Sequence, residues 1–247
     1  MKKILTTAIL CAGLVGFTAC DSFLDEDPKS SLTLDTYYKT SADIIGNVNY
    51  LYRDGAPDKM GNMTGAYRGS SLSVMNMVTG YFVNEYEGQE VDCSYARQLN
   101  RQDFTQSCCN YLTNNTWKDC YKSINVANAV IKYVDGVEMD NQAQYKAEAR
   151  FFRALNYFYL VKMFGDVPMV TEPTEDATLV EYPTRTAASE VFNTVIIPDL
   201  QFAVENLPNA TFAGNSHRVT KYAADMLLAD VYMRLGEYAN AVTPLKD

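Results

Sequence analysis

Histidine, tryptophan and metal-binding cysteine pairs are scarce in this sequence. Its 247 residues include one histidine, His217, one tryptophan, Trp117, and no Cys-x-x-Cys pair. A structural zinc site takes about four closely grouped cysteine or histidine ligands, so the composition disfavours one. Gly-x-Ser-x-Gly and glycine-rich phosphate motifs, which mark serine hydrolases and nucleotide-binding enzymes, are also missing. We therefore expect no catalytic residues, no cofactor and no bound metal.

Positive charge is in deficit as well. The chain has 21 Lys and Arg against 30 Asp and Glu, which gives a formal net charge of −9. Two of the lysines, Lys2 and Lys3, are the only charges in residues 1–19, so the chain without that segment carries −11. Such a chain repels nucleic acid, and nucleic-acid binding is disfavoured.

The only long uncharged, mostly apolar run is at the N-terminus. After Lys2 and Lys3 it extends from residue 4 to residue 17, and two small residues then precede Cys20. This pattern predicts a secretory signal over residues 1–19, too short to span a membrane comfortably. The small residues before Cys20 resemble a bacterial lipobox, which implies cleavage and lipidation of Cys20. The alternative is a plain secreted protein in which Cys20 is incidental. An acidic tether leading into the first helix follows over residues 20–40.

Four cysteines remain once Cys11 leaves with the signal and Cys20 is lipidated. They are Cys93, Cys108, Cys109 and Cys120. An even number in an exported protein permits disulfides, but the sequence does not determine their pairing. A bond between the adjacent Cys108 and Cys109 would be strained. Bonds from Cys93 to Cys109 or Cys120 both stay open.

Apolar periodicity predicts a mainly helical protein. In residues 142–164 apolar side chains recur at steps of three and four on two faces, which predicts a helix packed between others. Only a narrow strip, to which we assign Lys146, Glu148, Arg150 and Arg153, is expected to face water. Gly165 suits a left-handed residue at the helix end, and Pro168 and Pro173 favour an extended exit.

Further helices are expected on both sides of this one. We expect one capped by Ser41 and one that starts at Asn115 or Thr116. A third, over residues 187–207, should be broken locally by Pro198. A helical pair turns at Gly236. Asn128 and Asn156 lie within apolar seams, so we expect each to form a hydrogen bond between helices. Trp117 also fits its helix seam, which favours core packing over a role as a sugar platform.

Residues 57–110 lack any sustained period and are rich in glycine, asparagine, serine and tyrosine. Aromatic and polar groups on loops held by a helical scaffold are common ligand contacts. We predict that Tyr81, Tyr86, Tyr95 and Arg97 contact the ligand. The alternative is a compact loop packed by its own rings.

Three sequence stretches carry a family resemblance. AEARFFRALNYFYLVKMFGDVPMVTEP and WKDCYKSINVANAVI resemble motifs of the SusD/RagB family, whose members are nutrient-binding lipoproteins of the outer membrane. The spacing from Ala224 to Ala241 resembles part of a tetratricopeptide repeat, a helical hairpin. The resemblance implies a mainly α fold of tetratricopeptide-like hairpins with long irregular loops, over residues 41–247. Family members are about twice this long, so we expect an incomplete domain.

The resemblance also implies a function. The protein is expected to bind an oligosaccharide or a peptide at the cell surface, held to the outer membrane by lipid. It is expected to deliver the ligand to a SusC-like TonB-dependent transporter. One alternative is a helical scaffold that binds mainly a protein partner or peptide, with no glycan affinity in this chain. A glycosidase is the other, but no spacing places two carboxylates on one pocket wall. The sequence does not identify the ligand.

Overall fold

The computed structural model describes residues 34–52, 78–81, 83, 98, 100–103, 106–174 and 183–246. Contacts divide the chain into two units, residues 1–37 and 38–247. In the first unit the structure describes a single helical turn, α2 (Leu34–Tyr37). The predicted signal, the lipidated Cys20 and most of the tether lie outside the described residues, so these remain predictions.

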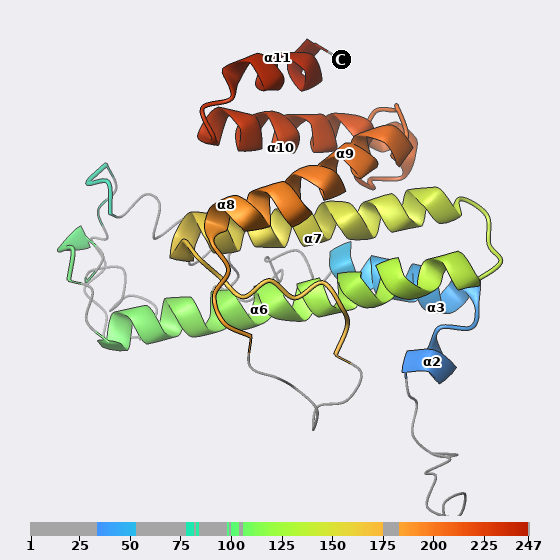
Figure 1. Cartoon of the computed structure of the whole chain (residues 1–247), viewed down its shortest axis with the longest axis horizontal. Helices are drawn as coiled ribbons and strands as arrows, with labels where there is room; N and C mark the ends of the chain where they lie inside the picture. The colour runs from blue at the N-terminus through green and yellow to red at the C-terminus, as the bar shows by residue number, and fades with distance from the viewer. Residues whose placement is uncertain are drawn as a thin grey trace, which may run out of the picture. The chain divides into compact units, whose positions relative to one another are not determined.

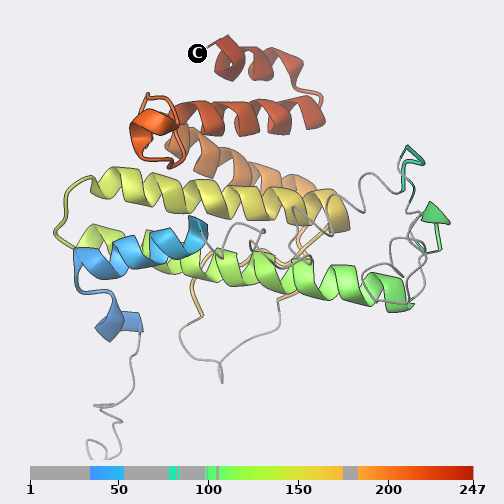
Figure 2. The same cartoon turned by 180° about the vertical axis from the view of Figure 1, so that it is seen from behind.

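The second unit is built from helices packed side by side (Figures 1 and 2). The long helices α6 (Gln106–Tyr133) and α7 (Gln142–Phe164) form an antiparallel hairpin through a short 3-10 turn, η3 (Val134–Gly136). Helix α3 (Ser41–Tyr50) packs on both of them. The remaining elements follow in chain order: α8 (Ala188–Val191), η5 (Phe192–Ile196), α9 (Ile197–Asn206), η6 (Ala213–Asn215), α10 (Lys221–Arg234) and α11 (Tyr238–Lys246).

Successive helices pack in a row, as helical hairpin repeats do. Helix α9 packs on α7, α10 packs on α9, and α11 packs on α10. The described residues hold one isolated β-bridge and otherwise helices, turns and connections. The predicted fold class, mainly α with tetratricopeptide-like hairpins, is confirmed. None of the described helices is both long and apolar enough to cross a membrane.

Two predicted helix starts were wrong. Helix α3 is capped by Thr40, not Ser41: Thr40 is extended, at φ −123° and ψ 159°, and its N–H and hydroxyl donate to Asp43 Oδ2 at 2.8 and 2.7 Å. Helix α6 begins at Gln106, well before Asn115. Its first turns are polar and hide the apolar period, but neither Gly nor Pro interrupts them.

Helix α7 buries two of the charged residues that were expected to face water. Glu148 is fully buried and Arg153 is 8% exposed, so the predicted wet strip was wrong at these positions. Arg153 Nη1 donates to Asn128 Oδ1 on α6 at 2.9 Å, which confirms the hydrogen bond between helices that was predicted for Asn128. The described bond of Asn156 runs to Phe152 O on its own helix, at 2.7 Å. Both buried charges have partners, as burial of charge requires.

The extended exit from α7 is anchored by side chains. Gly165 has the predicted positive φ, +69°, but its ψ of −124° belongs to a region that only glycine adopts readily, not to the left-handed helical region. Val167 then pairs with Thr186 through two backbone hydrogen bonds of 3.2 and 2.9 Å. Further along, carbonyls of the exit accept hydrogen bonds from Tyr121, Asn128, Tyr157 and Arg153.

The α-helix is interrupted locally just before Pro198, as predicted, but the chain stays helical. The chain passes from α8 through η5, a π-helical stretch, into α9. Ile197 N–H bonds to Phe192 O, five residues back, and the wider turn accommodates the proline ring that would collide with the carbonyl of an α-helix. The C-terminal hairpin turns at Gly236, whose φ is +76°. Its small side chains Ala224, Ala229 and Ala241 are buried, as the repeat-like spacing predicts.

Candidate ligand-binding site

Of the four predicted ligand contacts, the structure describes Tyr81. Tyr81 follows a turn at residues 78–80, its side chain is 88% exposed, and its N–H donates to Thr79 Oγ1 at 3.4 Å. In Figures 1 and 2 this turn lies at the same side of the molecule as the N-terminal end of α6. Tyr86, Tyr95 and Arg97 lie outside the described residues, so the grouping of these four side chains stays a prediction.

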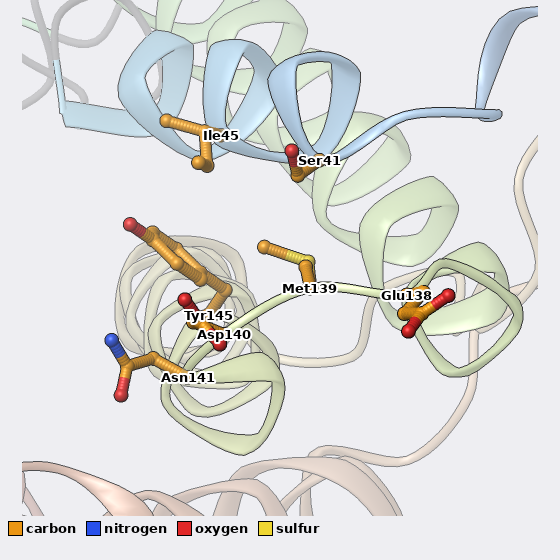
Figure 3. A pocket seen from close by; sticks show the side chains of 7 residues that line it. All are labelled: Ser41, Ile45, Glu138, Met139, Asp140, Asn141 and Tyr145. Atoms are coloured by element: carbon orange, nitrogen blue, oxygen red, sulfur yellow. The ribbon is translucent and has the colours of Figure 1, made fainter.

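A surface pocket of about 640 Å³ opens at the other end of the α6–α7 hairpin. Figure 3 shows it between the start of α3 and the start of α7. Small-molecule sites usually have volumes of about 300–1,000 Å³ and combine apolar walls with a few polar groups. The lining residues have this mixture: Ser41, Ile45, Glu138, Met139, Asp140, Asn141 and Tyr145.

Local structure fixes the pocket's walls. Ser41 and Ile45 lie one turn apart at the start of α3, whose first turn is stabilised by the cap that Thr40 and Asp43 form. Asn141 adopts the left-handed conformation, φ 56° and ψ 29°, at the residue before α7. Gln142 Nε2 donates to the carbonyls of Val134 and Val137 at 2.8 and 3.0 Å. The first residue of α7 is therefore hydrogen-bonded to the turn that follows α6, which holds the loop between the two long helices in place.

An ionic cluster behind Tyr145 holds three segments together. Arg218 lies in the connection before α10, and its guanidinium contacts fully buried Glu148 on α7. Nε lies 3.0 Å from each carboxylate oxygen of Glu148, and Nη2 lies 2.5 Å from Oε2. Nη1 donates to Asn49 Oδ1 on α3 at 2.8 Å. This Arg218–Glu148 cluster joins α3, α7 and the connection from α9 to α10.

Two tyrosine rings enclose the guanidinium of Arg218. The Arg218 Cζ lies 4.7 Å from the ring centre of Tyr52 and 5.3 Å from that of Tyr145. The Tyr52 hydroxyl accepts the Val219 N–H at 2.9 Å. Burial and the Glu148 charge raise the pKa of Tyr52, so this phenol stays neutral. Burial lowers the pKa of Arg218, but hydrogen bonds and charge from Glu148 outweigh it and raise that pKa overall. The Tyr145 ring, which forms one wall of the pocket, thus lies against a guanidinium that Glu148 holds in place.

The charges that line the pocket favour ligands that donate hydrogen bonds over ligands that only accept them. Its lining includes two carboxylates, Glu138 and Asp140, and no lysine or arginine. Within the part of the chain that the structure describes, no group of three or more acidic, histidine or cysteine side chains could hold a metal. The arrangement can bind a polar molecule that offers hydroxyl or ammonium donors and an apolar face. Sequence reasoning missed these residues because the loop that carries most of them matches no motif.

Cys120 lies in the middle of α6 and is a free, fully buried cysteine. Burial raises the pKa of its thiol, which keeps it protonated and unreactive. The proposed alternative of a disulfide between Cys93 and Cys120 is therefore wrong. Cys93 and the side chains of Cys108 and Cys109 lie outside the described part of the structure, so their pairing stays open.

Comparison with known proteins identifies the class of this helical protein. Residues 22–233 match a family model, SusD-like, described as starch-binding and associating with the outer membrane. A SusD-like protein, P2, of Formosa agariphila is 29% identical over 244 residues, which are 98% of this chain and 45% of that protein. A SusD-like protein of Bacteroides ovatus is 28% identical over 248 residues, covering 97% of this chain and 40% of that one.

Solved structures agree with the sequence match. A SusD-like carbohydrate-binding protein of Bacteroides fragilis superposes with a TM-score of 0.68 at 21% identity, over 86% of this chain and 40% of its own. A laminarin-binding SusD-like protein gives a TM-score of 0.67 at 25% identity, over 85% and 43%. The chain belongs to the SusD-like family. It spans less than half the length of the curated relatives that it matches.

Proposed function

We propose that the protein is a glycan-binding lipoprotein of the outer membrane that hands its ligand to a SusC-like TonB-dependent transporter. The observation that carries this proposal is the family match over residues 22–233, whose description joins starch binding to the outer membrane. The laminarin-binding structure, at 25% identity, supports a polysaccharide as the ligand class. The protein binds without catalysis, so its substrate leaves unchanged.

Glycan binding is tested by affinity electrophoresis of the purified chain in gels that contain laminarin, starch or mannan. At least one glycan should retard the protein, and incubation should release no new reducing ends. Replacing Tyr86 or Tyr95 with Ala should weaken retardation about tenfold, because a nucleobase stacked on one aromatic ring contributes on the order of 1–3 kcal/mol and a sugar face on a tyrosine ring should contribute on that scale. Tyr222→Ala, on exposed α10, is the matched control. Unchanged mobility in every glycan would reject the proposal for this chain.

Anchoring and transporter pairing need separate measurements. Wild type should incorporate labelled fatty acid and sediment with outer membranes, whereas Cys20→Ser should do neither, because more than one acyl chain is needed for stable anchoring. A TonB-dependent barrel should copurify with the wild-type protein from cross-linked membranes of the native cell. Membrane sedimentation that persists in Cys20→Ser would contradict the lipid anchor while leaving glycan binding open.

A protein-binding scaffold is the second candidate, supported by an exposed apolar face on the last two helices. Its side chains are 41% to 70% exposed, and patches of this kind on a helical hairpin commonly mark protein contacts. Copurification of the barrel without measurable affinity for any glycan would favour this candidate, and replacing Met226 and Tyr238 with Ser should then abolish copurification. The face comprises Tyr222, Met226, Met233, Tyr238, Val242 and Leu245.

A further inference from the structure

We propose that the pocket between α3 and α7 is a second carbohydrate site, which none of the predicted contacts Tyr81, Tyr86, Tyr95 and Arg97 lines, and that it is selective for uncharged or amino sugars. The inference rests on the proposed glycan-binding function but names a different site. The pocket lies at the C-terminal end of helix α6, Gln106–Tyr133, and the described turn at residues 78–80 lies near its N-terminal end (Figures 1 and 2). Its 28 residues rise about 42 Å. Residues 100–103 precede its first turn, and the pocket lies past its last.

The pocket has the two components that a sugar ring requires. The Tyr145 ring and the side chains of Ile45 and Met139 supply an apolar wall for the C–H face of a pyranose (Figure 3). Ser41, Asp140 and Asn141 add polar residues to the lining. A volume of about 640 Å³ accommodates one or two sugar units.

The Tyr145 wall is formed before any ligand arrives. The guanidinium of Arg218 lies 5.3 Å from its ring centre, and fully buried Glu148 fixes that guanidinium through hydrogen bonds of 2.5 to 3.0 Å. Ligands bind more tightly to a wall whose rotamer is already set, since no side-chain entropy is lost on binding. Arg218 is therefore a positioning residue for this pocket.

Selectivity follows from the sign of the charge at the rim. Glu138 and Asp140 are both exposed at the mouth, and each carboxylate accepts hydrogen bonds from hydroxyl or ammonium groups. The same carboxylates repel uronate and sulfate groups, and no cation in the lining offsets them. Neutral and amino sugars are thus favoured over acidic polysaccharides at this site.

Methyl NMR on selectively labelled methionine tests the proposal, because Met139 lies in the pocket and Met226, 70% exposed on α10, lies outside it. Laminaritriose, maltotriose and glucosamine are the probes, and trigalacturonate is the anionic comparison. At least one neutral or amino sugar should shift the Met139 methyl signal and leave that of Met226 in place. Trigalacturonate should shift neither signal. Assignment of the two signals comes from single Met→Leu variants.

Variants separate this site from the loops. Asp140→Asn should weaken the Met139 response to a neutral sugar about five- to tenfold, since a hydrogen bond to a charged group is about twice as strong as a neutral one. The double variant Glu138→Gln/Asp140→Asn should admit trigalacturonate. Glu190→Gln, an exposed acid on α8, is the matched control and should change nothing. Arg218→Lys should weaken binding, because the Tyr145 ring loses the guanidinium beside it, and circular dichroism should confirm the fold of each variant.

Three outcomes overturn the inference in distinguishable ways. Glycan retardation in gels with a silent Met139 signal would place all binding elsewhere and leave the proposed function intact. Equal Met139 shifts with trigalacturonate and laminaritriose would remove the charge selectivity. No response to any sugar, in gels or in NMR, would overturn both the pocket and the proposed function.

Discussion

Arg153 and Asp199 form a bidentate ion pair that joins α7 to α9. Arg153 Nε donates to Asp199 Oδ2 at 2.7 Å and Nη2 donates to Oδ1 at 2.9 Å. The side chains are 10% and 3% exposed. Burial raises the pKa of Asp199 even though Arg153 opposes the shift. The pair therefore holds the two helices in register at a cost in desolvation.

Breaking this pair should destabilise the fold strongly. Asp199→Leu leaves Arg153 buried without its main partner, and we expect the free energy of unfolding to fall by about 3–5 kcal/mol. The double variant Arg153→Met/Asp199→Leu removes both charges and should be more stable than Asp199→Leu alone. Urea unfolding followed by circular dichroism measures both. Glu172→Gln is the control, because its 3.9 Å pair with Lys132 is exposed and should contribute less than about 1 kcal/mol. A double variant less stable than the single one would contradict this account.

Arg218 should stabilise the fold on a similar scale. It joins three segments, whereas the Arg153–Asp199 pair joins two. Arg218→Met leaves fully buried Glu148 without its counter-ion, and we expect a loss of about 3–5 kcal/mol. Arg218→Lys should recover part of that loss, since an ammonium restores the charge but cannot also reach Asn49 in a fork. Tyr52→Phe should cost about 1–3 kcal/mol, because it removes the acceptor of the Val219 N–H and the hydroxyl that hydrogen-bonds to buried Glu148. Equal stabilities of the Lys and Met variants would show that the charge itself contributes little.

Replacing either of two glycines with alanine should change the free energy of unfolding, but in opposite directions. Gly165 has φ +69° and ψ −124°, so Gly165→Ala forces a strained backbone and should cost more than about 1 kcal/mol. Gly46 lies on the exposed side of α3, and a Cβ atom added there would have no atom within 4 Å. Gly46→Ala should therefore raise the free energy of unfolding by about 0.5–1 kcal/mol. Thermal unfolding of both variants beside the wild type measures the pair. A loss of stability in Gly46→Ala would point to a role for α3 flexibility.

The cap of α3 should make stability depend on acid pH. Hydrogen bonds from Thr40 hold the pKa of Asp43 below its ordinary value of 3.8. A carboxylate with a lowered folded pKa adds stability above its unfolded pKa and loses it as the pH falls through the folded pKa. Asp43→Asn should thus be less stable than wild type near neutral pH, and the difference should shrink as the pH falls below 3.8 and through the lowered folded pKa of Asp43.

Urea midpoints measured across that pH range provide the check for Asp43. Glu190→Gln serves as the comparison, because Glu190 is an exposed acid in a first helical turn without a capping box. If the difference between Asp43→Asn and wild type stayed constant with pH, the cap would be acting through shape and not through charge.

The core of the fold was predictable from local sequence signals. The bounds of α7 followed from its apolar period and from Gly165 and Pro168, which act within a few residues. The start of α6 was missed because its first turns are polar. The burial of Glu148 and Arg153 was missed for a different reason: their partners, Arg218 and Asp199, lie 70 and 46 residues away. A sequence pattern in one helix contains no information about a counter-ion that distant.

The candidate pocket was out of reach for the same physical reason. Ser41 and Ile45 come from one helix, and the rest of the lining comes from a loop and the first turn of α7, almost a hundred residues further on. Only the packing of α3 on the long hairpin brings them together. The loop residues Tyr86, Tyr95 and Arg97 were predicted from composition and position, and they remain predictions.

The exit from α7 has an implication for how this protein behaves in concentrated solution. An extended apolar segment with free backbone groups invites a neighbouring molecule to add a strand. Here Tyr157 both donates to and accepts from Val170, while Tyr121 and Asn128 bond to the carbonyls of Pro168 and Glu172. Phenol and amide groups thus take the place of a neighbouring strand. Loss of these hydroxyls should show first as self-association, before any loss of helix.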